Sequence, residues 1–228
     1  MSLRPRYPSY VDLDPLIDVA RLTALDAYIR RRLERRLTAE RDLRFYTGPF
    51  VLEADSPTVS GSRMVYLAAT DQPDDYYDLD RCEHWHPSDE VEEFSELMDF
   101  IATLPFAATG RMLIMYDPEG LPVTAHRDHD SQDLCHEFVW LRTNLDKPFY
   151  LLNPETGEKS YVRGHAAWFD TVNQYHGADR TGELSWSIRI DGRFTDEFRS
   201  RMPDASATRA NAAALCRRRS NATTLSRA

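Results

Sequence analysis

Apolar residues recur at the spacing of an amphipathic helix in two stretches of the chain. The first stretch predicts a helix that begins at Asp12 or Asp14 and ends near Leu37. Its apolar positions, three or four residues apart, are Leu22, Leu25, Ile29, Leu33 and Leu37. The second stretch predicts a helix over 88–104, with Ser88 as its N-cap. Each helix therefore has one apolar face that can pack against other elements.

Five arginines surround the apolar stripe of the first predicted helix. They are Arg30, Arg31, Arg32, Arg35 and Arg36. The favoured interpretation is a solvated helix face paired with nearby acidic side chains, because charge runs are common on exposed faces. The alternative interpretation is a patch that binds an anionic partner.

Between residues 105 and 194 the pattern changes to short apolar runs separated by turn residues. The predicted strands cover 111–116, 136–141, 149–152, 159–162, 166–169 and 185–190. Turns are predicted at 117–120 and 153–157, where Pro, Gly and Asn cluster. Many short strands with closely spaced turns favour a sandwich or barrel. We therefore expect an α+β protein with a β-rich core at about 105–194, N-terminal helices and a short C-terminal helix.

Two further segments precede this core. Residues 45–69 contain short runs that predict strands joined by turns. Residues 71–87 are acidic and aromatic and predict a loop that carries specificity. His84 and His86 lie in this loop, and we expect them to line the mouth of a pocket or to face solvent, because no third ligand follows at close spacing.

Length and composition narrow the class of protein. A chain of 228 residues fits one domain, which we expect at 1–203, and the polar composition of 204–228 predicts a frayed helix or a disordered tail. The net charge of −9 argues against a general nucleic-acid binder. No apolar run approaches the roughly 20 residues that span a bilayer, and the N-terminus lacks the apolar core of a signal peptide. Three scattered cysteines predict free thiols in a reducing cytoplasm.

The strongest chemical signal is a pair of histidines with one carboxylate. His126 and Asp128 are separated by one residue, so they emerge on the same side of an extended segment. His176 follows fifty positions later, at the end of a predicted strand. Two histidines and one carboxylate with open positions form the facial triad of non-haem Fe(II) enzymes, and the fold would have to bring these residues together.

Neighbouring residues offer rival ligands for such a metal. His129, Asp130 and His136 all have suitable donor atoms. We favour His126 and Asp128 because they follow the strand–turn–strand segment most directly.

Arg189 lies thirteen positions after the second histidine, in a predicted strand. Strand alternation places it on one face together with Ser187 and Ser185. The opposite face carries Trp186, Ile188 and Ile190. An inward arginine with a neighbouring hydroxyl could hold a carboxylate. The alternative is that this face lies on the outside of the protein.

Five short segments carry a family resemblance. They are Tyr-Asp-Pro-Glu-Gly at 116–120, Ala-His-Arg-Asp-His at 125–129, Trp-Leu-Arg-Thr-Asn at 140–144, Gly-His-Ala-Ala-Trp-Phe-Asp at 164–170 and Ser-Ile-Arg-Ile-Asp at 187–191. These segments resemble the Fe(II)/2-oxoglutarate-dependent oxygenase superfamily, and within it the aspartyl/asparaginyl β-hydroxylase and proline hydroxylase-like branch. The resemblance covers about a third of the chain and implies a double-stranded β-helix, a cupin-like jelly roll.

The resemblance implies roles for individual residues. His126, Asp128 and His176 would be the ligands of Fe(II), with 2-oxoglutarate and O2 as co-substrates. His136 aligns with a histidine that contacts the 2-oxoglutarate carboxylate in the β-hydroxylases. Substrate contacts would come from Arg142, Trp140 and Trp168, together with the segment around His84 to His86.

The chain also departs from the branch that it resembles. Aspartyl hydroxylases of the mammalian type lack the carboxylate ligand, whereas Asp128 gives the fuller triad of the small amino-acid hydroxylases. An aspartate there also argues against a halogenase, which needs a small residue. The arginine that binds 2-oxoglutarate in the aspartyl hydroxylases would fall nearer Ser185 than Arg189.

These features predict a dioxygenase that hydroxylates an unactivated C–H of an amino acid, or of a small molecule or peptide that contains one, with succinate and CO2 as co-products. The expected partner is this substrate, without nucleic acid or membrane, and the oligomeric state is open. One alternative is a jelly-roll protein that binds zinc or manganese and does not use 2-oxoglutarate. Another is a non-enzymatic interaction module whose histidines are merely packed.

Overall fold

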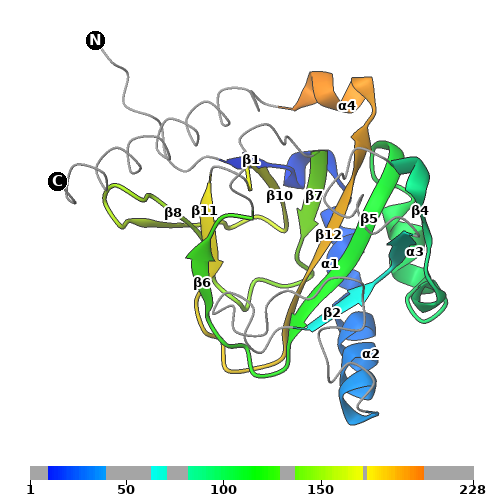
Figure 1. The fold of residues 1–228 in the computed structure, drawn as a ribbon, viewed down its shortest axis with the longest axis horizontal. Coiled ribbons are helices and arrows are strands. Elements are labelled where there is room, and N and C mark those ends of the chain that lie inside the picture. Colours follow the sequence, from blue (N-terminus) through cyan, green and yellow to red (C-terminus); the bar gives the residue numbers. More distant parts are fainter. Residues whose placement is uncertain (1–9, 40–62, 71–81, 129–136, 172–173, 203–228) are drawn as a thin grey trace.

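Two antiparallel sheets form the centre of the protein, and helices cover the outer side of one of them (Figure 1). The computed structural model describes residues 10–39, 63–70, 82–128, 137–171 and 174–202. The large sheet has six strands in the order β1-β10-β7-β12-β5-β2, and the small sheet has four in the order β6-β11-β8-β9. A third, two-stranded sheet pairs β3 with β4.

The strands have the following bounds: β1 Tyr10–Asp12, β2 Arg63–Tyr66, β3 Ala68–Thr70, β4 Trp85–Pro87, β5 Phe106–Asp117, β6 Val123–His126, β7 Glu137–Leu141, β8 Phe149–Leu152, β9 Lys159–Tyr161, β10 Ala166–Phe169, β11 Tyr175–Ala178 and β12 Ser185–Phe194. The helices are α1 Val19–Ala24, α2 Asp26–Thr38, α3 Ser95–Ile101 and α4 Asp196–Arg201. Single turns of 3-10 helix are η1 Asp14–Leu16, η3 Cys82–His84 and η4 Asp89–Val91.

The eight strands from β5 to β12 pass back and forth between the two sheets. β5, β7, β10 and β12 belong to the large sheet, whereas β6, β8, β9 and β11 form the small one. Every pair among them is antiparallel. This winding is the double-stranded β-helix, or jelly roll. It confirms the fold class that the family resemblance implied and that the spacing of strands and turns had narrowed to a sandwich or barrel.

The inner face of the large sheet looks toward the small sheet. Arg189 of β12 lies opposite Trp140 of β7, so both side chains project on the same face. The ring of Trp140 lies 4.2 Å from that of Phe149 on β8, across the space between the sheets. Polar and aromatic side chains of the large sheet therefore face the strands that carry the two histidines.

The outer face of the large sheet is apolar and lies under the helices. Ile188 of β12 is opposite Leu141 of β7, and both are fully buried. The guanidinium of Arg30 on α2 lies 4.9 Å from the ring of Trp186 on this face. The helices contribute a row of fully buried side chains to the same core: Leu22, Ile29, Leu33, Leu97 and Phe100. The amphipathic stripes predicted from the sequence are thus the faces that pack on the sheet.

The first predicted helix is broken into three parts. η1, α1 and α2 follow one another, and Asp18 caps α1 by accepting a hydrogen bond from Arg21 N at 2.9 Å. The prediction of Asp12 or Asp14 as the cap was wrong. Asp14 instead accepts hydrogen bonds from the backbone of His165 and Ala166 at 3.0 and 2.7 Å, so its carboxylate ties the N-terminal segment to β10.

The second predicted helix also begins later than expected. Ser88 caps the short turn η4 by accepting a hydrogen bond from Glu90 N, and α3 starts only at Ser95. The loop prediction for 71–87 was wrong at its end, because residues 85–87 form β4 and pair with β3. Residues 71–81, the part of the predicted strand segment from 45 to 62 and the tail at 204–228 lie outside the described residues.

Among the described residues, acidic side chains form ion pairs with Arg36 on the arginine-rich face of α2. Arg36 is buried and forms ion pairs with Glu90 and Glu93 at 2.5 Å each. Arg32 donates to the backbone carbonyl of Glu93 and stacks on the Tyr28 ring. Arg36 is therefore paired with acids as the favoured interpretation predicted, but it is buried and not solvated, and it joins α2 to the segment before α3.

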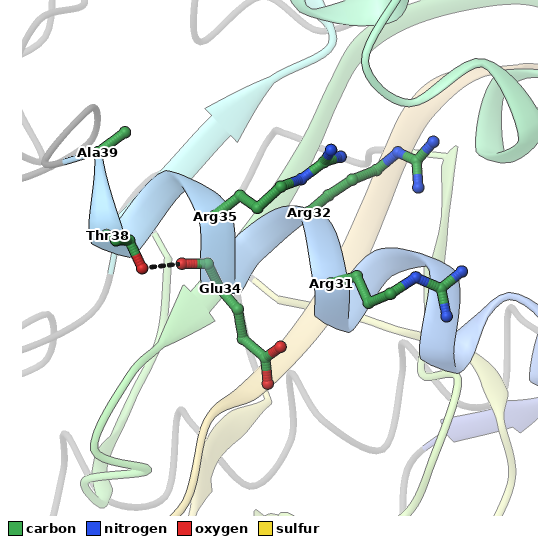
Figure 2. A pocket seen from close by; sticks show the side chains of 6 residues that line it. All are labelled: Arg31, Arg32, Glu34, Arg35, Thr38 and Ala39. Atoms are coloured by element: carbon green, nitrogen blue, oxygen red, sulfur yellow. Dashed lines mark hydrogen bonds between the residues drawn. The ribbon is translucent and has the colours of Figure 1, made fainter.

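A surface hollow of about 620 Å³ lies along α2 (Figure 2). It is lined by Arg31, Arg32, Glu34, Arg35, Thr38 and Ala39. None of the candidate metal ligands lines it. Among the described residues, no helix is long and apolar enough to cross a membrane.

Candidate metal centre

The pairing of β6 with β11 brings the two histidines together. His126 on β6 lies directly opposite His176 on β11. Asp128 follows β6 within two residues, and its backbone N–H donates to the carbonyl of Thr171 at 3.0 Å. The donor atoms of His126, Asp128 and His176 lie within 4.8 Å of one another. Within the described parts of the chain, these three residues are the one group of this kind, as the spacing of the sequence predicted.

One carboxylate oxygen of Asp128 faces both imidazoles. Oδ1 lies 3.2 Å from Nε2 of His176 and 3.8 Å from Nε2 of His126. The side chain of His176 is nearly enclosed at 9% exposure, whereas those of His126 and Asp128 are exposed by 26% and 23%. The three groups therefore converge on a point that is accessible from one side.

Each imidazole is oriented by the backbone carbonyl of the residue two positions before it in the chain. Nδ1 of His126 lies 2.8 Å from Thr124 O, and Nδ1 of His176 lies 3.0 Å from Gln174 O. A carbonyl oxygen can only accept a hydrogen bond, so Nδ1 carries the proton in both rings. The lone pair of each ring is then on Nε2, the atom that faces Asp128. Hydrogen bonds of this type fix the tautomer and the ring direction of metal-binding histidines.

The environment of His126 and Asp128 favours the protonation state in which each binds a metal ion. Burial lowers the pKa of His126, and the nearby His176 ring acts in the same direction. Burial would raise the pKa of the Asp128 carboxyl, but the His176 ring and the Arg189 guanidinium hold that pKa well below its usual range. Neutral imidazole and ionised carboxylate are the forms that bind a metal ion.

The second oxygen of Asp128 is bound by Arg189. Nη1 of Arg189 donates to Oδ2 of Asp128 at 2.8 Å, and Nε donates to Oδ1 of Asp191 at 2.9 Å. The guanidinium lies 4.3 Å from the ring of Phe138, over its face. Arg189 thus lies on the inner face and contacts the triad directly, whereas the sequence had left open an outward position.

Aromatic side chains form a wall beside His176. The rings of Phe169 and Phe149 lie 5.1 and 6.1 Å from its imidazole. Trp140 packs behind them, 4.2 Å from Phe149 and 6.2 Å from Phe169. Sequence reasoning singled out Trp140 but missed the two phenylalanines. The alternation of β10 could have indicated Phe169, since Phe169 shares a face with Ala167, which is opposite Trp140.

Arg142 lies among backbone carbonyls. Nη2 donates to the carbonyls of Val162 and Gly164, both at 2.7 Å, and Nη1 donates to Lys147 O at 3.3 Å. Burial lowers the pKa of Arg142 to about 10. The guanidinium therefore holds the loop between β9 and β10, and its predicted contact with substrate stays a prediction.

The other predicted site residues have different positions. Ser187 is partly buried and shares the inner face with Arg189. Trp168 is buried, and the alternation of β10 assigns it to the face opposite Phe169. His136 lies outside the described residues, as do the rival ligands His129 and Asp130.

Comparison with known proteins gave no match to a family model and none to a curated protein. Solved structures similar to this chain include a Pseudomonas putida prolyl-4-hydroxylase, with 12% identity over 83% of this chain and 94% of that one and a TM-score of 0.44. A Trichoplax adhaerens prolyl hydroxylase in complex with a hypoxia-inducible-factor peptide fragment has 10% identity, coverages of 84% and 86%, and a TM-score of 0.47.

A viral collagen prolyl hydroxylase from Paramecium bursaria Chlorella virus-1 has 10% identity, coverages of 81% and 95%, and a TM-score of 0.37. At these identities and TM-scores the likenesses add nothing on function. The strand pairing of this chain defines the fold, and the three converging side chains define the candidate metal centre.

Proposed function

We propose that this protein is an Fe(II)- and 2-oxoglutarate-dependent dioxygenase. It would hydroxylate an unactivated C–H of an amino acid, or of a small molecule or peptide that contains one, and release succinate and CO2. The observation that carries the proposal is the convergence of His126, Asp128 and His176 at one accessible point inside a double-stranded β-helix. Three protein ligands on one side leave positions open for a co-substrate and dioxygen.

The donor set fits a divalent first-row metal ion. Two imidazole nitrogens and one carboxylate oxygen are the donors of the 2-His-1-carboxylate sites of Fe(II) oxygenases. His126, Asp128 and His176 would hold the metal. When bound, Fe(II) and 2-oxoglutarate would supply the oxidising chemistry, with dioxygen as oxidant.

The residues of the chain orient the ligands and exclude water. The carbonyls of Thr124 and Gln174 keep both Nε2 atoms directed at the metal position. Arg189, on the inner face, would bind the far carboxylate of 2-oxoglutarate through donors that it does not use for Asp128 and Asp191. Ser187 would contribute a hydroxyl from the same face, and His136 stays a candidate for the same carboxylate.

The substrate would enter from the exposed side of the triad. The wall of Phe169, Phe149 and Trp140 encloses the opposite side, next to His176. Aromatic side chains exclude water and so strengthen electrostatic interactions inside the site. Trp140 packs behind the two phenylalanines of this wall. Arg142 is bound by backbone carbonyls, and Trp168 lies on the face of β10 opposite Phe169. For all three residues, contact with the substrate stays a prediction.

Anaerobic titration of the apo-protein with Fe(II) and 2-oxoglutarate tests the proposal. The pair should produce a weak visible charge-transfer band that neither produces alone. Asp128→Ala should abolish the band, because it removes one of three ligands, and Arg189→Ala should weaken it. Arg31→Ala, which removes an arginine from the hollow on α2, is the matched control and should leave the band unchanged.

A turnover assay would then follow succinate formation during a screen of amino acids and short peptides. Succinate released in excess of the uncoupled background, and absent with Asp128→Ala, would identify the substrate class. The same three ligands also suit zinc or manganese. Tight zinc binding with no effect of 2-oxoglutarate on spectrum, stability or turnover would contradict the oxygenase proposal and support a metal protein of another kind.

A further inference from the structure

We propose that Asp191 and Arg111 are positioning residues that act on the metal through Arg189. They hold the Arg189 guanidinium against Asp128, so that this ligand presents a single oxygen to the metal. The inference rests on the proposed function, because it requires Asp128 to be a metal ligand. It assigns a role to two side chains that touch neither metal nor co-substrate.

Asp191 is the fixed point of this arrangement. Its side chain is fully enclosed, at 0% exposure, and its two oxygens accept from different arginines. Oδ1 accepts from Nε of Arg189 at 2.9 Å, and Oδ2 accepts from Nε of Arg111 at 3.0 Å. Because Asp191 and Arg189 belong to β12 and Arg111 belongs to β5, the longest strand pair of the sheet sets the geometry.

The Arg189 guanidinium has little freedom to turn. Nε is held by Asp191, and the planar group lies over the ring of Phe138. In this orientation Nη1 points at Oδ2 of Asp128, 2.8 Å away. Because Asp191 and Phe138 already fix the guanidinium, it loses little conformational entropy when it also binds Asp128. It can therefore hold the Asp128 carboxylate in one orientation.

The two carboxylate oxygens of Asp128 therefore have different partners. Oδ2 is bound by Arg189, while Oδ1 faces the Nε2 atoms of His176 and His126. A carboxylate bound in this way is held to one-oxygen coordination and cannot rotate to occupy a second position. Positions needed for a co-substrate therefore stay open.

Arg189 would also link metal binding to co-substrate binding. Within the described residues, its hydrogen bonds use Nε and Nη1 only. Nη2, with two N–H donors, is left for the carboxylate of a bound molecule. Loss of Asp191 should therefore weaken both the metal and the carboxylate ligand, because both depend on one guanidinium orientation.

The test measures the affinity of the apo-protein for Mn(II), which needs no turnover. Free Mn(II) is followed by electron paramagnetic resonance, and the affinity for 2-oxoglutarate is then measured on the Mn(II)-loaded protein. Asp191→Asn, which keeps the shape but removes the charge, should weaken Mn(II) binding by about 10- to 100-fold. Arg111→Gln should act in the same direction with a smaller effect, because Asp191 then keeps its contact with Arg189.

A matched control separates positioning from general loss of stability. Arg36→Gln breaks a buried ion pair in the helix layer and should lower the melting temperature while leaving the Mn(II) affinity unchanged. The double variant Arg111→Gln/Asp191→Asn should bind Mn(II) no more weakly than Asp191→Asn alone, since both changes act through one guanidinium.

The outcomes distinguish this inference from the proposed function. If the wild type binds Mn(II) no better than Asp128→Ala, the proposed metal centre is wrong. If the wild type binds Mn(II) and folded Asp191→Asn binds it equally well, the positioning role is overturned and the metal centre stands. Should Asp191→Asn fail to fold, Arg111→Gln decides, and unchanged affinity in that folded variant overturns the role.

Discussion

At the scale of single residues, each proposed ligand has its own orienting contact. The two histidines use backbone carbonyls two residues before them in the chain, so their orientation depends on local backbone geometry and not on other side chains. Asp128 lies beyond the end of β6 and depends on Arg189 instead. The carboxylate is therefore the ligand whose position is most sensitive to a distant substitution.

The protonation of His126 should make the stability of the apo-protein depend on pH. Burial and His176 lower the pKa of His126, so the unfolded chain binds a proton there more readily than the folded one. The contribution to stability is present above the unfolded pKa of about 6.5 and is lost as the pH falls below it. The melting temperature of apo-protein should fall between about pH 7 and pH 5, and His126→Gln should reduce that slope.

A matched measurement on His84→Gln, which alters a histidine outside the triad, serves as control for this effect. Its pH slope should equal that of the wild type. Equal slopes for His126→Gln and the wild type would show that His126 does not contribute to the acid sensitivity.

The sequence predicted that His126, Asp128 and His176 would come together, but not which residues support them. Spacing alone also left His129, Asp130 and His136 as rival ligands, and these lie outside the described residues. Asp191 follows Arg189 on the same face of β12. Its second partner, Arg111, lies on β5, and the sequence does not show that β5 pairs with β12. Arg142 donates to backbone carbonyls of a loop. The pattern of apolar and polar residues does not predict loop conformation, so these contacts could not be predicted from the sequence.

At the scale of elements, the metal centre depends on the close pairing of β6 and β11. Gly177 follows His176 in β11 and has no room for a side chain. A Cβ there would lie 2.6 Å from Val123 O and 2.7 Å from the hydroxyl of Tyr150. The absence of a side chain thus lets the two ligand-bearing strands approach.

Gly177→Ala should disturb this pairing and the site together. Overpacking of this kind costs about 1–3 kcal/mol in free energy of unfolding. Mn(II) affinity should also fall, because any shift of β11 relative to β6 separates His176 from His126. Denaturant unfolding and metal titration on the same sample measure both effects.

The control for this substitution lies in the hairpin between β8 and β9. Gly157 has φ of +74° and nothing within 4 Å of a built Cβ, and asparagine tolerates such a φ. Gly157→Asn should leave the metal affinity unchanged. Full metal affinity in Gly177→Ala would contradict the dependence of the site on the β6–β11 approach.

Elements were predicted well where alternation and turn signals coincide. β8 and β10 have the bounds expected from the sequence, and the turn at 153–157 joins β8 to β9 as predicted. The breaks in the first helix were missed, because the apolar stripe continues through them. At the start of the segment, the Asp14 carboxylate binds the backbone of His165 and Ala166, so it does not cap a helix there.

At the scale of the whole molecule, the metal centre and the helix layer lie on opposite sides of the large sheet (Figure 1). The triad faces the inner side, whereas α1, α2 and α3 pack on the outer side. Stability and metal binding should therefore be separable by substitution.

Leu33→Ala should show this separation. Leu33 is fully buried in α2, and truncation of such a side chain costs about 2–5 kcal/mol in free energy of unfolding. The Mn(II) affinity should not change. Saturating metal, at about 100 times its dissociation constant, should then stabilise the variant and the wild type by the same amount, about 2.7 kcal/mol.

Thermal unfolding with and without Mn(II) measures both quantities. If Mn(II) stabilises the wild type but not Leu33→Ala, the helix layer and the proposed metal centre are coupled through the sheet. Exposed Thr38 in the same helix provides the control, and Thr38→Ala should change neither quantity appreciably.

The short strand β1 determines where the protein can be safely truncated. It pairs with β10 from Tyr10 to Asp12, and without it β10 would be an outer strand with free backbone donors and acceptors. Exposed edges of this kind recruit the edges of other copies. A recombinant chain that starts at Val19 should therefore self-associate, visible as increased light scattering, even though every proposed metal ligand is retained.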